Sequence, residues 1–227
     1  MREWCKLPIE MQCEEIKQYY DILRKRKLTL RLKRAFDVIL SGCLLILLSP
    51  VFVIVAIWIK SDSDGPVFFC QNRVTAYGIT FKIIKFRTMI TDADKKGTQV
   101  TKENDIRITN VGKKIRRLRL DEIPQLINVI KGDMTFVGTR PEVPKYVKYY
   151  TNEMRATLLL PAGITSRASI EYKDEDKLLS NASNVDAVYV EQIMPEKMKY
   201  NLQAMKEFSV LNDLKIMIQT VAAVLRR

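Results

Sequence analysis

An uncharged, apolar stretch from Val38 to Ile59 constrains this chain more than any other feature. At roughly 1.5 Å per residue, a helix of this length matches the hydrocarbon core of a membrane, which is about 30 Å thick. The pair Ser49-Pro50 lies inside the stretch. Because proline lacks a backbone N–H and clashes with the carbonyl four residues earlier, we expect the helix to break there. The Ser49 hydroxyl can bond a carbonyl that the break frees.

Basic residues flank this stretch on both sides. Seven Lys and Arg residues lie between positions 24 and 34, and Lys60, Lys82, Lys85 and Arg87 follow. A straight span would place one basic flank on the wrong side of the membrane, against the positive-inside tendency. Residues 35–49 and 51–59 would form helices of roughly 22 and 14 Å, each too short to cross. A hairpin that enters and leaves on one face satisfies both flanks. A kinked helix that spans fully is the alternative that the residues leave open.

The charge balance favours an anionic partner. Lys and Arg number 38 against 26 Asp and Glu, which gives a net charge of +12. Lipid headgroups, phosphorylated substrates and nucleic acids are all candidates. No nucleic-acid recognition motif is present and the apolar stretch fits such a role poorly, so we predict no nucleic-acid partner. Histidine is absent, so catalysis must use other residue types. The four cysteines form no C-x-x-C, which indicates free thiols.

The pattern outside the apolar stretch predicts mixed α and β structure. The segments "GPVFF", "TFKIIKF" and "MTFVG" are typical of strands, and "KKIRRLRLDEIPQLINVIKGD" and "MPEKMKYNLQAMKEF" of helices. Residues 1–34 are expected to be mostly helical, with one face made of Ile9, Ile16, Tyr19, Tyr20 and Leu23. A second helical stripe closes the chain, and it suits either the core or a membrane interface. Its members are Val210, Leu211, Leu214, Met217, Ile218, Val221, Val224 and Leu225.

The adjacent acids Asp121 and Glu122 are the main catalytic candidates. They precede Pro124, which suits a first helical position, and Arg116, Arg117 and Arg119 lie just upstream. A helix N-terminus and guanidinium groups both favour ionised carboxylates. An ionised Asp can attack phosphorus, and a neighbouring carboxylate can hold Mg²⁺. A helix cap with salt bridges is the alternative.

Further cations could bind a diphosphate. Strand alternation places Lys85 and Arg87 on one face, and Arg140 follows the strand-like "MTFVG". Taken singly, each is more typical of an ordinary surface cation. Two matches to D-x-D, a metal–nucleotide motif of many glycosyltransferases, are weak signals: Asp62-Ser63-Asp64 and Asp92-Ala93-Asp94.

Several blocks in a fixed order carry a family resemblance from about residue 31 to the C-terminus. They are "KRAFD", the apolar stretch with Ser-Pro, "GPVFFCQNR", "FKIIKFRTM", "NDIRITNVGKKIRRLRLDEIPQLINVIKGDM", "FVGTRPE" and "PAGITS". In this order the chain resembles the bacterial sugar transferase family, the small monotopic phosphoglycosyl transferases.

The resemblance implies a reaction and a set of site residues. Members transfer a phospho-sugar from a UDP-sugar to a membrane polyprenol phosphate, with UMP leaving, and they start a surface glycan. By this resemblance Asp121 forms a covalent phospho-sugar intermediate, Glu122 binds Mg²⁺ and Arg140 holds the nucleotide phosphate. Ser49-Pro50 breaks a re-entrant helix, so the active site lies at the lipid headgroups on the cytoplasmic face of the bacterial inner membrane.

The residues and the resemblance together predict an α+β monotopic membrane protein. We expect a basic extension over residues 1–34, a re-entrant membrane helix over 35–60, and a catalytic domain with amphipathic interfacial helices over 61–227. The predicted substrate-binding residues are Lys85, Arg87, Arg119 and Arg140. A D-x-D glycosyltransferase and a basic membrane-anchored scaffold are the rival functions. The sugar, the polyprenol, the oligomeric state and the role of residues 1–30 are left open.

Overall fold

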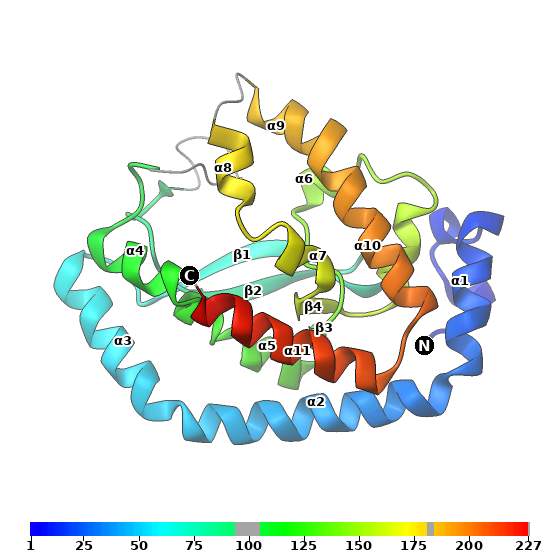
Figure 1. Cartoon of the computed structure of the whole chain (residues 1–227), viewed down its shortest axis with the longest axis horizontal. Coiled ribbons are helices and arrows are strands. Elements are labelled where there is room, and N and C mark those ends of the chain that lie inside the picture. Colours follow the sequence, from blue (N-terminus) through cyan, green and yellow to red (C-terminus); the bar gives the residue numbers. More distant parts are fainter. Residues whose placement is uncertain (94–104, 181–183, 227) are drawn as a thin grey trace.

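The computed structural model describes residues 1–93, 105–180 and 184–226 (Figure 1). Two long helices, α2 (Lys27–Leu47) and α3 (Ser49–Asp62), run along the edge of the molecule. Pro50 lies in the first turn of α3, and the Ser49 hydroxyl donates to the Ile46 carbonyl at 2.8 Å. The predicted break at Ser49-Pro50 is therefore confirmed. Within the described residues no single helix could cross a membrane, whereas α2 and α3, bent by 60°, could do so together by length and composition.

Helix α2 turns its polar side inward and its apolar side outward. Lys33, Asp37 and Ser41 are buried in it. Lys33 Nζ lies 2.6 Å from Asp213 Oδ2, and Asp37 accepts a hydrogen bond from the Thr135 hydroxyl. This is the reverse of the pattern of a water-soluble surface helix. The large apolar side chains that α2 exposes are Leu28, Leu32, Phe36, Val38, Ile39, Ile46 and Leu47.

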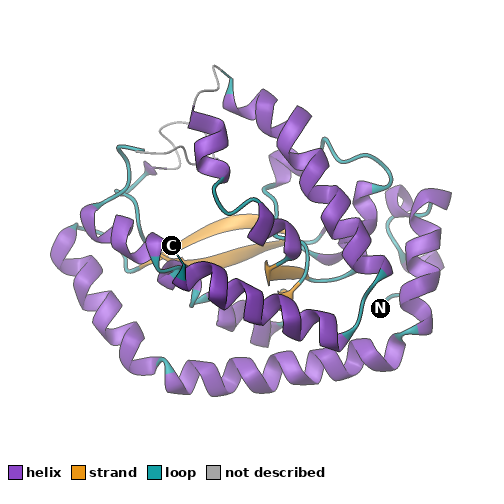
Figure 2. Cartoon of the chain, viewed as in Figure 1, coloured by secondary structure: helices purple, strands orange, loops and turns teal. Residues whose placement is uncertain are grey.

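Two small sheets occupy the middle of the molecule, with helices around them (Figure 2). Strands β1 (Phe68–Val74) and β2 (Thr80–Phe86) form an antiparallel hairpin, and β3 (Met134–Val137) pairs in parallel with β4 (Ala162–Thr165). These strands confirm the three predicted strand segments, although β1 starts only at Phe68. The hairpin turn contains Tyr77, whose backbone has a φ of 60°.

Residues 113–133, which were predicted as mostly helical, lie mostly in three short helices. They are α4 (Asn110–Arg117), the 3₁₀ turn η5 (Leu120–Glu122) and α5 (Gln125–Lys131). Arg119 has a left-handed backbone with a φ of 55°, which ends the first helix and redirects the chain into η5. Gly132, with a φ of 95°, ends α5.

The described part of the C-terminal half is mostly helical and contributes strand β4. Helix α10, in the predicted helical segment "MPEKMKYNLQAMKEF", has Pro195 in its first turn. Helix α11 divides its predicted apolar stripe between two environments: Met217 packs on the core around β3, as does Ile216 beside it, while Leu211 and Ile218 are exposed. The helices of this half are α6 (Pro144–Val147), η6 (Met154–Leu159), α7 (Arg167–Glu171), α8 (Glu175–Ser180), α9 (Val185–Val188), the π-helix η7 (Tyr189–Ile193), α10 (Met194–Lys206) and α11 (Val210–Leu225).

The N-terminal segment packs onto this helical half. It forms the short turns η1 (Trp4–Lys6) and η2 (Ile9–Met11) and helix α1 (Glu14–Lys25). The predicted apolar face is buried in α1 as Ile16, Tyr19, Tyr20 and Leu23, together with Ala156, Leu159, Met205 and Phe208. Ile9 was wrongly placed on that face: it is 89% exposed, because it lies in η2, before α1 begins.

Candidate active site

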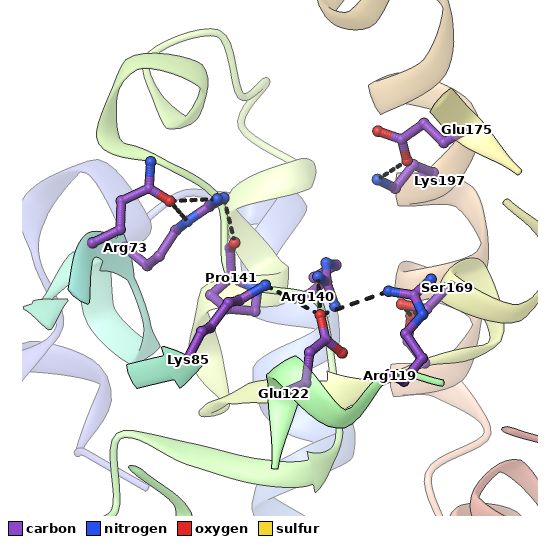
Figure 3. Close-up of polar contacts among 11 residues, drawn as sticks. Arg73, Lys85, Arg119, Glu122, Arg140, Pro141, Ser169, Glu175 and Lys197 are labelled. Atoms are coloured by element: carbon purple, nitrogen blue, oxygen red, sulfur yellow. Dashed lines mark hydrogen bonds and ion pairs between the residues drawn. The ribbon is translucent and has the colours of Figure 1, made fainter. Parts of the chain in front are cut away.

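The two adjacent acids lie on η5, and both are buried. The Glu122 carboxylate is the centre of a cationic cluster (Figure 3). Its Oε1 atom lies 2.5 Å from Arg140 Nη2, 3.1 Å from Lys85 Nζ and 3.6 Å from Arg119 Nη1. Three of the four predicted substrate-binding cations therefore converge on one carboxylate, although they come from three separate parts of the chain.

Local backbone structure positions each of these cations. Lys85 is next to last in β2, and Arg119 adopts the left-handed conformation just before η5. Arg140 follows β3 in a loop that a close backbone approach holds in place: Gly163 N–H donates to the Thr139 carbonyl at 2.8 Å. A Cβ on Gly163 would lie only 2.2 Å from the nitrogen of Gly138, so this approach requires glycine.

Burial and charge move the pKa values of the two acids in opposite directions. Burial disfavours ionised Glu122, but Arg140, Lys85 and Arg119 outweigh it and hold the pKa of Glu122 well below its ordinary value. Burial, together with the neighbouring charge of Glu122, raises the pKa of Asp121. Burial also lowers the pKa of Lys85, and the charge of Glu122 opposes this. Glu122 is thus the ionised carboxylate of the pair, whereas the ionised form of Asp121 would be stabilised by any further positive charge.

Two side chains near this turn have unpartnered polar atoms. Asp121 Oδ1 is buried without a hydrogen-bond partner among the described residues, and so are both polar atoms of Gln125 at the start of α5. Within the described chain no three Asp, Glu, His or Cys side chains are grouped to hold a metal. Mg²⁺ commonly takes only one or two carboxylates, with substrate phosphates and water completing the shell. The Asp121–Glu122 pair fits that requirement.

Arg87 does not join this cluster, which corrects the prediction from strand alternation. Strand β2 ends at Phe86, and Arg87 is buried elsewhere, where it donates to the carbonyls of Ser63 and Asp64. Its guanidinium ties the end of α3 to the end of β2. The first D-x-D match also has a structural role, because the Asp62 carboxylate accepts the Val111 N–H at 3.0 Å. Part of the second match, Asp94, lies outside the described residues.

Sequence reasoning assigned no role to several polar residues around the cluster. Gln125 follows a helix-starting proline, but no pattern marks it as buried. Arg73 on β1 donates to the carbonyl of Pro141, the residue after Arg140. Glu142 is buried and accepts a hydrogen bond from the Tyr189 hydroxyl. These contacts join segments that are distant in sequence, so only the alternation of the "CQNR" strand could have drawn attention to one of them.

A known protein family matches most of the chain, including the region of this site. The family model described as "Bacterial sugar transferase" matches residues 28–227, which include the bent helix pair, the acid pair and all the cations around it. This chain belongs to the bacterial sugar transferase family. The resemblance drawn from the ordered sequence blocks is therefore confirmed.

Named relatives of this bacterial sugar transferase share its core region. A UDP-N-acetylgalactosamine-undecaprenyl-phosphate N-acetylgalactosaminephosphotransferase from Aeromonas hydrophila is 33% identical over 86% of this chain and 44% of its own length. A UDP-glucose:undecaprenyl-phosphate glucose-1-phosphate transferase from Escherichia coli (strain K12) is 37% identical over 84% of the chain and 39% of its own length. The exopolysaccharide production protein ExoY from Sinorhizobium fredii is 32% identical over 85% of this chain and 84% of its own length. The chain thus spans less than half the length of the first two.

Proposed function

We propose that this bacterial sugar transferase moves a phospho-sugar from a UDP-sugar to a membrane polyprenol phosphate, and so starts a surface glycan. The observation that carries the proposal is the buried Asp121–Glu122 pair with Lys85, Arg119 and Arg140 around it. These cations can transfer their hydrogen bonds from Glu122 to a diphosphate. The names of the relatives support both the UDP-sugar donor and the undecaprenyl-phosphate acceptor.

Two displacements at phosphorus make up the proposed reaction. A carboxylate oxygen of Asp121 attacks the phosphorus that bears the sugar, and the bond to the bridging oxygen breaks, so UMP leaves with that electron pair. A phosphate oxygen of the polyprenol phosphate then attacks the same phosphorus, and the Asp121 carboxylate leaves. The product is a polyprenol diphosphate sugar. A covalent intermediate lets two anionic substrates use one site in turn.

Mg²⁺ is the proposed cofactor, with Glu122 as its protein ligand and the neighbouring Asp121 within the same turn. When bound, the metal would offset the negative charge of the diphosphate. Glu122 is already ionised through its cationic neighbours, and it can exchange them for the metal when the donor phosphates arrive. The cations Lys85, Arg119 and Arg140 orient the diphosphate against Asp121 in this scheme.

We also propose that the bent helix pair is re-entrant and that the protein lies on the cytoplasmic face of the inner membrane. Both arms pack on the same folded body: Lys33 of α2 pairs with Asp213, and Val55 and Ile59 of α3 are buried against α4. If the pair spanned the membrane, its two ends would lie on opposite sides of the bilayer, and they could not both pack on that body. If each helix is inclined to the membrane plane by half of the 60° bend, the 14 residues of α3 reach about 10 Å below the membrane surface, which is within one leaflet.

Single-turnover measurements test the catalytic proposal. With Mg²⁺ and a UDP-sugar but without lipid acceptor, the wild type is expected to release UMP in a burst close to one per active site. Asp121→Asn keeps size and shape but removes the attacking charge, so it should abolish the burst and leave the fold intact. Mass spectrometry should place the phospho-sugar on the peptide that contains Asp121. An adduct elsewhere, or UMP release that strictly requires the lipid, would contradict the covalent mechanism.

The same assay separates the rival functions. A D-x-D glycosyltransferase, which transfers sugar alone, would release UDP, and a basic scaffold would release neither nucleotide. The structural role of Asp62 as a partner of the Val111 N–H gives the first rival less support. A panel of UDP-sugars in this assay would also identify the preferred donor.

A further inference from the structure

Arg73 is a partly buried cation beside the proposed site, and no sequence pattern assigned it a role. Its Nε and Nη2 atoms donate to Gln71 Oε1 at 3.0 and 2.7 Å, and Nη1 donates to the Pro141 carbonyl at 3.1 Å (Figure 3). All of these acceptors are uncharged. Among the described residues no carboxylate lies within 4 Å of this guanidinium, so burial has not been compensated by a direct ion pair.

The strand register places Arg73 on the same side as the site. Phe69 pairs with Lys85, Gln71 with Ile83 and Arg73 with Phe81 in the β1–β2 hairpin. Alternate residues share a face of a strand, so Gln71, Arg73 and Lys85 stand on one face of this hairpin. Figure 3 shows Arg73 and Lys85 reaching from the neighbouring strands toward the segment of Arg140 and Pro141.

The charge of Arg73 and its unused N–H donors would both favour a bound anion at this position. Burial lowers the pKa of Arg73, and although Glu142 opposes this, the charge of Arg140 adds to the lowering, so the two guanidinium groups repel one another. Glu122 is already shared by three other cations. A guanidinium has five N–H donors, and the three contacts of Arg73 leave two of them unused.

We propose that Arg73 donates its two remaining N–H groups to a phosphate oxygen of the diphosphate donor, with Gln71 fixing the orientation of the guanidinium. Gln71 Oε1 accepts from Nε and Nη2 and the Pro141 carbonyl accepts from Nη1, so one N–H on each of Nη1 and Nη2 is left for the ligand. This role rests on the proposed phosphoglycosyl transfer and adds a contact to those of Lys85, Arg119 and Arg140. A purely structural arginine that braces the Pro141 carbonyl is the competing explanation.

Arg87 provides the control, because it is another arginine whose hydrogen bonds go to uncharged carbonyl oxygens, but it is more deeply buried and lies away from the site. The measurement is calorimetric binding of Mg²⁺-pyrophosphate and of UDP to the full chain in detergent, with Tm recorded for each variant. Arg73→Gln is expected to weaken both ligands about 10- to 100-fold, the usual worth of a hydrogen bond to a charged group. Arg87→Gln should lower Tm and leave both affinities unchanged. Equal affinities for Arg73→Gln and wild type would overturn the proposal.

Gln71→Glu decides the matter if Arg73→Gln fails to fold. A carboxylate at this position would form an ion pair with Arg73 in the same contact, so it should maintain or raise Tm while it weakens pyrophosphate binding by neutralising the charge of the guanidinium. Unchanged pyrophosphate affinity in Gln71→Glu would refute ligand binding by Arg73. If wild type releases UMP while these variants bind normally, this inference fails and the proposed function stands. Arg73-dependent binding without UMP release from wild type would instead refute the proposed function.

Discussion

Arg140 makes the shortest contact to Glu122 and emerges from a loop that glycine packing holds in place. Arg140→Ala is expected to cost roughly 2–4 kcal/mol in transition-state binding, the usual effect of losing a preorganised charge contact. Arg140→Lys should recover little, because the planar fork is lost. Steady-state kcat/KM measures the effect, and exposed Arg117→Ala serves as the control. Equal kcat/KM for the two alanine variants would remove Arg140 from the site.

For individual residues, the sequence predicted membership of the candidate site where a charged residue lies within a recognisable motif. Asp121, Glu122, Arg119 and Arg140 belong to recognisable blocks, and Lys85 follows from strand alternation. Arg87 belongs to the same alternating run, but the strand ends one residue earlier and nearby carbonyls take its donors. Gln125 and Arg73 also lie in recognisable blocks, but they were given no role because their burial and their contacts across the fold are not encoded in a local pattern.

The bent pair of α2 and α3 gives a prediction about topology. In a cysteine-free background, single cysteines at the exposed positions Asp21 and Thr80 should react with an impermeant thiol reagent from the same side of sealed vesicles. Both flanks are basic, and both arms pack on one body, so a re-entrant pair keeps these positions together. Reaction from opposite sides would show that the pair spans the membrane. Pro50→Ala in the same assay tests whether the break itself prevents spanning.

The buried ion pair between α2 and α11 gives a second prediction for these elements. Lys33 lies 2.6 Å from Asp213 and 4.0 Å from Asp37. Lys33→Met would leave buried acids without their cation, which typically costs about 3–5 kcal/mol. Denaturant unfolding in detergent should show this loss, whereas Lys27→Met at an exposed position of the same helix should change little. Similar midpoints for both variants would mean that the pair does not hold α11 to α2.

The sequence pattern predicted the type and limits of several elements, but it did not predict which other parts of the fold each element packs against. The break at Ser49-Pro50, the strands and the end of α5 at Gly132 follow from local chemistry. The interruption at Arg119 does not, because a left-handed arginine requires tertiary contacts that offset its strain. The stripe of α11 fitted two environments, and the helix divides its apolar residues between them.

In the whole molecule, α1 belongs to the folded body although it precedes the region that the family model matches. Leu23 is fully buried in the shared core, so Leu23→Ala should destabilise the protein by about 2–5 kcal/mol. Ile9→Ala, at an exposed position of the same segment, should stay within about 0.5 kcal/mol of wild type. Unfolding midpoints in detergent compare the two. A negligible effect of Leu23→Ala would show that α1 does not contribute to the core.

Helix α2 is a continuous rod that has exposed apolar side chains on its outer side and contacts the strand leading to the site on its inner side. Its Asp37 binds the Thr135 hydroxyl on β3, and Arg140 follows in the loop directly after that strand. In the re-entrant arrangement proposed above, the outer side of this rod lies in lipid, and its tilt then changes when the bilayer becomes thinner, thicker or more curved. Such a tilt would act on β3 through a buried hydrogen bond and would reach the guanidinium that contacts Glu122 within a few residues. Under that proposal, bilayer thickness and curvature would change the geometry of the cations around Glu122.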